Sequence, residues 1–143
     1  MNGPGVERFA PGPVQEPAKQ GLVHHVMLYI EDGEDNIYLV EALLKRRPQI
    51  ELHVARNGRD GVQAALDKRP GLILLDNRLP DATGAEIMRE LAAAAATAAI
   101  PVVILSSDTA EIIGELLANG AAEFISKPFD IHQFMATIDR YLP

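Results

Sequence analysis

The stretch from Leu72 to Gly84, LILLDNRLPDATG, joins four aliphatic residues to an aspartate and then to a turn that contains Pro, Asp and Gly. A short, continuous apolar run is typical of a central strand of a parallel sheet, which is covered on both faces. The predicted strand therefore ends on a carboxylate, Asp76. Such an aspartate is either a turn or capping residue, or part of a site at the end of the sheet.

Other short aliphatic runs repeat this pattern along the chain. They are VMLYI (26–30), IELHVA (50–55), VVILS (102–106) and AEFIS (122–126). Segments with apolar residues at helical spacing follow each of these five runs. This alternation predicts βα units around a parallel sheet, and we expect an α/β fold with five strands and five helices.

Polar residues mark where the predicted helices begin. The pattern predicts Asp35 or Asn36 as the cap of the first helix, Asn57 at the start of the second, a third helix from about Gly84 into the alanine tract, Asp108 or Ser107 as the cap of the fourth and Asp130 as the cap of the fifth. Each of these side chains can accept a hydrogen bond from a free amide of the first turn.

Composition limits the class of protein. The chain has 143 residues, of which 48% are hydrophobic and 23% charged, as expected for one soluble domain. It has no cysteine, which excludes disulfides and thiolate metal sites. A net charge of -7 argues against a nucleic-acid surface and against an anionic membrane face.

The tail, the longest apolar run and the absence of a signal sequence bear on the domain boundary and on where the protein is located. Residues 1–23 are rich in Pro and Gly, and we expect a flexible tail there, followed by one domain over 24–143. The apolar run from Leu91 to Leu105 is short for a bilayer and contains Pro101, so we expect no membrane insertion. No secretory signal is recognisable, and these features together predict a cytoplasmic protein.

Polar chemistry follows four of the five predicted strands. Glu31 and Asp32 follow the first, Asp76 the third, Ser106 ends the fourth, and Lys127 follows the fifth. Ligands of open parallel sheets bind at the carboxyl ends of the strands, where the strand order reverses. We therefore expect these residues to form one site.

The chemistry of these residues points to a metal ion and a phosphoryl group. Close carboxylates repel one another by roughly 4 kcal/mol per pair at an effective dielectric constant near 20, so a cation is needed among them. Hard oxygen ligands favour Mg²⁺ over zinc or copper. Lys127 and Ser106 are suited to contact phosphoryl oxygens, and Asp76 is placed to act as the nucleophile.

The sequence resembles the receiver domain of bacterial two-component response regulators, of the stand-alone type, over about residues 25–143. The matching motifs are YIEDGEDN, LILLDNRLPDATG, PVVILSSD and FISKPFD. The resemblance implies a flavodoxin-like (βα)5 three-layer sandwich with a parallel five-stranded sheet in the order 2-1-3-4-5, which agrees with the count of strands and helices.

The resemblance also implies a set of roles. Asp76 would accept a phosphoryl group from a sensor histidine kinase or a histidine phosphotransfer protein. Mg²⁺ would be held by Asp32, Asp76 and the backbone carbonyl of Arg78, with Glu31 acting mostly through water. Ser106 would move toward the phosphoryl group, Phe124 would swing inward behind it, and the Lys127–Pro128 bond would be cis.

The resemblance is less specific about how the domain passes its signal to a partner. The family uses the fourth helix, the fifth strand and the fifth helix as its switching surface, so we expect partners to bind there. The domain is expected to turn over no substrate beyond hydrolysing its own phosphoryl group. The chain ends at Pro143, so no attached output domain is expected, and the kinase, the target and a possible homodimer stay open.

Two residues near Asp76 depart from the family pattern or extend it. Asn77 stands where the family usually has a hydrophobic residue, and the sequence offers no reason for it. Arg78 and Asp108 lie two residues beyond Asp76 and Ser106 respectively. We expect them to form an ion pair across the mouth of the site, which would partly screen the acyl phosphate from water.

Other functions fit the sequence less well. A Mg²⁺-dependent phosphatase of the haloacid dehalogenase type needs a second acid two residues after the nucleophile, where this chain has Arg78. A mononucleotide-binding domain needs a glycine-rich loop after the first strand, where this chain has EDGEDN. A receiver-like interaction scaffold that works without phosphorylation stays open as the alternative.

Overall fold

The computed structural model describes residues 24–143, and the predicted tail (1–23) lies outside the described residues. The described chain alternates strands and helices. In order they are β1 (His25–Ile30), α2 (Glu34–Leu44), β2 (Ile50–Ala55), α3 (Gly58–Lys68), β3 (Leu72–Leu75), α4 (Gly84–Ala93), β4 (Val102–Ser106), α5 (Ala110–Ala118), β5 (Glu123–Ser126) and α6 (Ile131–Tyr141). In this part of the chain no helix has the length and apolar character needed to cross a bilayer.

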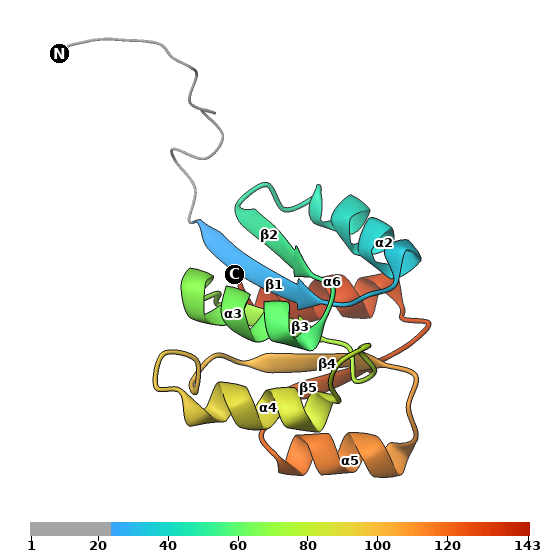
Figure 1. Cartoon of the computed structure of the whole chain (residues 1–143). Helices are drawn as coiled ribbons and strands as arrows, with labels where there is room; N and C mark the ends of the chain where they lie inside the picture. The colour runs from blue at the N-terminus through green and yellow to red at the C-terminus, as the bar shows by residue number, and fades with distance from the viewer. Residues whose placement is uncertain (1–23) are drawn as a thin grey trace, which may run out of the picture.

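The strands form one parallel sheet in the order β2-β1-β3-β4-β5. Helices cover both faces, with α2 and α6 on one side and α3, α4 and α5 on the other (Figure 1). This is the predicted flavodoxin-like three-layer sandwich, and the predicted strand order is confirmed.

The core consists of two apolar layers, one on each face of the sheet. Successive strand residues point to opposite faces, so each apolar run supplies both layers. In β3, Leu72 and Leu74 pack toward α2 and α6, whereas Ile73 and Leu75 pack toward the other three helices. All four are fully buried, which confirms that this run is a central strand.

Backbone hydrogen bonds continue past the ends of the strands and fix the residues that follow. The amide of Asp76 donates to the carbonyl of Ile30 at 3.0 Å, and the amide of Glu31 donates to the carbonyl of Ala55 at 2.9 Å. The amide of Lys127 donates to the carbonyl of Ser106 at 3.0 Å. The polar residues at this edge therefore start from backbone positions that the sheet holds.

Two predicted helix caps are wrong. Helix α2 begins at Glu34 and is capped by Gly33 without a side-chain hydrogen bond, so Asp35 and Asn36 lie within its first turn and not at its cap. Helix α5 is capped by Thr109, not by Asp108 or Ser107. The carboxylate of Asp108 accepts hydrogen bonds from other side chains, which leaves Thr109 to cap the helix.

The starts of the other three helices agree with those predicted from the sequence. Asn57 caps α3 and Asp130 caps α6, each by accepting hydrogen bonds from amides of the first turn. Helix α4 begins at Gly84, as predicted, behind a capping box formed by Thr83 and Glu86. The β3–α4 turn is also tied to α3, because the Asp81 carboxylate accepts hydrogen bonds from the amides of Gly58 and Arg59 at 2.7 and 3.0 Å.

Gly61 lets α3 pack closely against the end of β1. A Cβ at Gly61 would lie 2.6 Å from Cδ1 of Ile30, the last residue of β1. Gly61→Ala should therefore lower the free energy of unfolding by about 1–3 kcal/mol, because overpacking shifts a well-packed core. Urea unfolding measures this change.

Gly114→Ala is the matched control, because a Cβ there would meet nothing within 4 Å. In the middle of α5 it should raise stability by about 0.5–1 kcal/mol through helix propensity. A Gly61→Ala protein as stable as wild type would contradict the packing described for α3.

Candidate functional site

Three carboxylates meet at the carboxyl edge of the sheet. Glu31 and Asp32 follow β1 and Asp76 follows β3, its neighbour in the sheet, and each offers an oxygen that lies within 4.8 Å of those of the other two. Glu31 and Asp76 are buried, whereas Asp32 is exposed. The structure thus brings together the acids that the sequence placed at neighbouring strand ends.

Lys127 supplies a positive charge to this cluster. It follows β5, and its Nζ lies 3.0 Å from Oε1 of Glu31 and 3.7 Å from Oδ1 of Asp76. The ammonium therefore contacts Glu31 closely and Asp76 at longer range. One lysine does not balance three carboxylates, so the cluster keeps excess negative charge.

This excess charge changes the acidity of Asp76. Burial and the neighbouring Glu31 charge raise the pKa of Asp76 to about 6, against the opposing effect of Lys127 and of a hydrogen bond from the Arg78 amide. Burial and a neighbouring negative charge make the ionised form of a carboxylate unfavourable, and a bound cation stabilises that form. The hard oxygen donors present here fit a divalent cation such as Mg²⁺.

Glu31 is more fully hydrogen-bonded than the sequence indicated. Its Oε1 accepts from the Tyr29 hydroxyl at 2.9 Å in addition to Lys127. Its Oε2 accepts from the Gly33 amide at 3.1 Å and from the Asn36 side chain at 3.3 Å. Sequence reasoning missed Tyr29, although its spacing of two residues from Glu31 on a strand puts both side chains on one face.

A second cluster surrounds Asp108, whose side chain is only 2% exposed. One carboxylate oxygen accepts from the Ser106 hydroxyl at 2.6 Å and from the Asn77 amide at 2.8 Å. The other accepts from Nε of Arg78 at 2.7 Å. Ser106, which is 2% exposed, thus directs its hydroxyl to Asp108 in this structure.

The predicted Arg78–Asp108 ion pair is confirmed. The guanidinium is 76% exposed and lies over a buried carboxylate. Although burial of Asp108 acts in the opposite direction, the hydrogen bonds from Ser106, Arg78 and Asn77 hold its pKa at about 2. Asp108 is therefore charged at neutral pH.

The same cluster explains Asn77. Its side-chain amide donates to Asp108, and its side-chain oxygen accepts from the Gly84 amide at 3.0 Å. A hydrophobic side chain could make neither bond. Asn77 therefore links the start of α4 to Asp108, and a Cβ at Gly84 would lie 2.5 Å from the Asn77 oxygen, which explains the glycine there.

Two features implied by the resemblance lie near Lys127. Phe124, on β5, is half-buried and packs against the apolar layer beneath α3, α4 and α5. The Lys127–Pro128 peptide bond is cis, as the resemblance implies.

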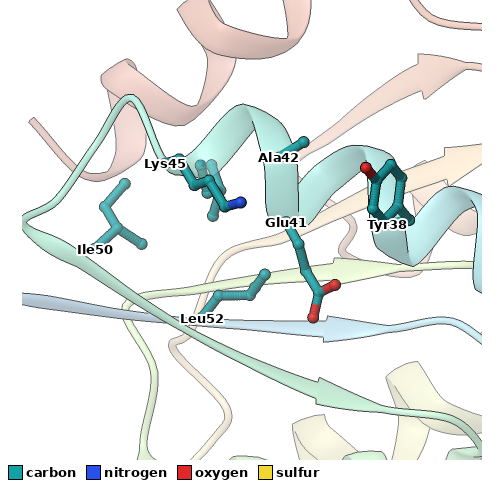
Figure 2. Close-up of a pocket in the computed structure, with 7 residues that line it drawn as sticks. Tyr38, Glu41, Ala42, Lys45, Ile50 and Leu52 are labelled. Carbon is teal, nitrogen blue, oxygen red and sulfur yellow. The ribbon is translucent and has the colours of Figure 1, made fainter.

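A hollow of about 390 Å³ lies between α2 and β2, and Figure 2 shows the residues that line it. Glu41 of α2 and Lys45, which directly follows α2, carry charges at its rim, and Ile50 and Leu52 of β2 form an apolar wall. None of its lining residues belongs to the acid cluster. It is therefore a feature distinct from the site at the strand ends.

Known proteins share both the sequence pattern and the fold. The family model of the response regulator receiver domain matches residues 27–139. Protein PilH of Pseudomonas aeruginosa is 31% identical over 119 residues, which are 81% of this chain and 96% of PilH. The polar-differentiation response regulator DivK of Brucella anthropi is 31% identical over 117 residues, which are 81% of this chain and 94% of DivK.

Solved structures agree. The receiver domain of a sensor histidine kinase of Pseudomonas aeruginosa, with a magnesium ion coordinated in its active site cleft, is 25% identical with a TM-score of 0.75, over 82% of this chain and 97% of that one. The phosphorylated cyanobacterial phytochrome response regulator RcpA is 28% identical with a TM-score of 0.72, over 83% and 94%. The chain thus belongs to the response regulator receiver domains, which act in phosphorylation-based two-component signalling.

Proposed function

We propose that Asp76 accepts a phosphoryl group from the phosphohistidine of a sensor histidine kinase or a histidine phosphotransfer protein. The position of Asp76 carries this proposal. It is a buried carboxylate at the end of the central strand, within reach of two further acids and 3.7 Å from a lysine. The magnesium-bound and phosphorylated receiver structures similar to this chain support it.

Asp32, Asp76 and the backbone carbonyl of Arg78 would hold Mg²⁺. The bound ion would neutralise negative charge on the carboxylates and on the phosphoryl oxygens. Asp32 suits this role because it is the exposed member of the cluster and is open to hydrated ions. Glu31 has four protein donors around its two oxygens, which favours a role at longer range, through water.

In the transfer step, an oxygen of Asp76 forms a bond to phosphorus as the bond from phosphorus to the donor histidine nitrogen breaks. The electron pair of the broken bond stays with the imidazole, which leaves neutral after taking a proton. Lys127 would donate to a phosphoryl oxygen, and the Ser106 hydroxyl would donate to another. Water later hydrolyses the acyl phosphate, and the domain turns over no other substrate.

Phosphorylation would change the surface formed by α5, β5 and α6. Ser106 must leave Asp108 to reach a phosphoryl oxygen, and Phe124 on the adjacent strand would move inward behind it. Leu117 on α5 and Ile131 on α6 are 41% and 42% exposed, and they offer apolar contacts on this surface. A partner that prefers the moved state would shift the equilibrium toward it.

Phosphoryl transfer can be tested directly with a small donor. Acetyl phosphate with Mg²⁺ should add one phosphoryl group to the wild-type chain, as measured by intact-protein mass spectrometry. Asp76→Asn should accept none, because the amide is not a nucleophile for this reaction. Asp67→Asn is the control, since Asp67 is an exposed residue of α3 that bonds only Gln63 among the described side chains, and it should behave like wild type. Unmodified wild-type protein would favour the phosphorylation-independent scaffold.

The ion pair over the site should affect the lifetime of the phosphoryl group. Arg78→Ala removes the exposed guanidinium, so water should reach the acyl phosphate more easily. The half-life of the phosphorylated protein should shorten by about two- to fivefold, the range that an interaction of up to roughly 1 kcal/mol allows. Arg56→Ala is a matched control because Arg56 is also exposed and paired, with Glu34. Equal half-lives in wild type and Arg78→Ala would show that the ion pair does not screen the acyl phosphate from water.

Charge at the site should also make stability depend on pH. The pKa of Asp76 is raised to about 6 in the folded protein, so the folded state binds more protons than the unfolded state between about pH 4 and 6, and stability falls as pH rises through this window. Without Mg²⁺, Asp76→Asn should be more stable than wild type at pH 7 by roughly 2–3 kcal/mol, and equally stable near pH 4.

Urea unfolding with a chelator at both pH values measures this difference. Addition of Mg²⁺ at pH 7 should stabilise the wild type and reduce the gap. An Asp76→Asn protein that is less stable than wild type at pH 7 would show that the charge of Asp76 is already balanced.

A further inference from the structure

Tyr29 is a fully buried tyrosine whose hydroxyl reaches the acid cluster from the apolar core. Its ring packs in the apolar layer beneath α2 and α6, together with Phe134. Tyr29 and Glu31 lie two residues apart along the β1 direction and thus on the same face. The hydroxyl donates to Oε1 of Glu31 at 2.9 Å.

With this hydrogen bond, protein donors fill the hydrogen-bonding sites of the Glu31 carboxylate. A carboxylate has about four lone-pair sites. Tyr29 and Lys127 occupy those of Oε1, at 2.9 and 3.0 Å. Gly33 and Asn36 occupy those of Oε2, at 3.1 and 3.3 Å.

Oε1 of Glu31 also determines where Lys127 lies. The same oxygen accepts from both the phenol and the ammonium, so the rigid, core-packed ring of Tyr29 fixes the atom that holds Nζ. Nζ then lies 3.7 Å from Oδ1 of Asp76. The lysine is thus near Asp76 without being bound tightly to it.

We propose that Tyr29 is a positioning residue for phosphoryl transfer to Asp76: its hydroxyl fixes Glu31 so that this carboxylate holds Lys127 and stays out of direct contact with the metal. The effect on transfer rests on the proposed function. The effect on Glu31 rests only on the hydrogen bonds around it.

Loss of the hydroxyl has two consequences. Oε1 loses a neutral donor, so its negative charge attracts Lys127 more strongly and draws Nζ away from Asp76. The freed lone pair also becomes available to a cation at the cluster, because Glu31 offers an oxygen within 4.8 Å of oxygens of Asp32 and Asp76.

Tyr29→Phe tests this inference, because it keeps the ring and removes only the hydroxyl. Mg²⁺ should bind more tightly, by about threefold or more in calorimetry. Phosphorylation by acetyl phosphate at saturating Mg²⁺ should slow by about fivefold, the usual size of effect for one neutral hydrogen bond. Tyr141→Phe is the matched control, since its hydroxyl donates to Glu123 at 2.7 Å, and it should change neither quantity.

A double-variant cycle separates positioning from a purely structural role. In a Glu31→Gln background, Tyr29→Phe should have no further effect on either quantity, because Tyr29 acts through the Glu31 charge. Unchanged Mg²⁺ affinity or rate in the single variant, or undiminished effects in the Glu31→Gln background, would overturn the proposal.

Two further arms keep the test decisive. If wild-type protein accepts no phosphoryl group, the proposed function fails, and the Mg²⁺ affinity of Tyr29→Phe alone decides the role of Tyr29. If Tyr29→Phe does not fold, Asn36→Ala removes a donor from the other oxygen of Glu31 and should also tighten Mg²⁺ binding. Unchanged affinity in that variant would then overturn the proposal.

Discussion

Negative charge crowded at one edge of a rigid sheet is the constraint on which the site depends. Glu31 and Asp76 are buried, and backbone hydrogen bonds to Ala55 and Ile30 hold the two residues close together. Like charges held this way raise the energy of the folded state unless donors and cations surround them. Lys127 supplies the positive charge, while a buried tyrosine and the start of α2 supply further donors to Glu31.

The two groups suited to contact a phosphoryl oxygen are both bound to carboxylates other than Asp76. Glu31 holds Lys127 at 3.0 Å, and Asp108 holds the Ser106 hydroxyl at 2.6 Å. In the proposed phosphorylated state, the new negative charge competes with these carboxylates for both donors. Asn77 connects Asp108 to the amide of Gly84, so release of Ser106 changes a cluster that also contacts the start of α4. The chemistry at Asp76 is thereby linked to β4, which carries Ser106, and to the start of α4.

The parallel sheet and the grouping of the acids were predictable because they follow from periodicity and from the geometry of parallel strands, whereas the strand order was implied by the resemblance to receiver domains. The pattern of LILL predicted the central strand, and its carboxyl end placed Asp76 beside Glu31 and Asp32. The cap of α5 was not predictable, because Asp108 accepts hydrogen bonds from Asn77 and Arg78, which are distant in sequence and which a capping rule does not consider. The predicted cap of α2 was wrong because the helix begins at Glu34, ahead of Asp35 and Asn36. The role of Asn77 was missed because its hydrogen bond to Asp108 joins residues that only the folded sheet brings near. Tyr29 was missed for another reason: its partner Glu31 is local, but strand alternation shows only that the two side chains share a face, not that they form a hydrogen bond.

A crystal structure of the protein with Mg²⁺ and beryllofluoride, a stable mimic of the aspartyl phosphate, tests the central claim most directly. We expect beryllium bound to an oxygen of Asp76, with Nζ of Lys127 moved from Glu31 toward one fluoride and the Ser106 hydroxyl moved from Asp108 toward another. Beryllofluoride absent from Asp76, or bound there while Ser106 still donates to Asp108 and Lys127 to Glu31, would contradict the account.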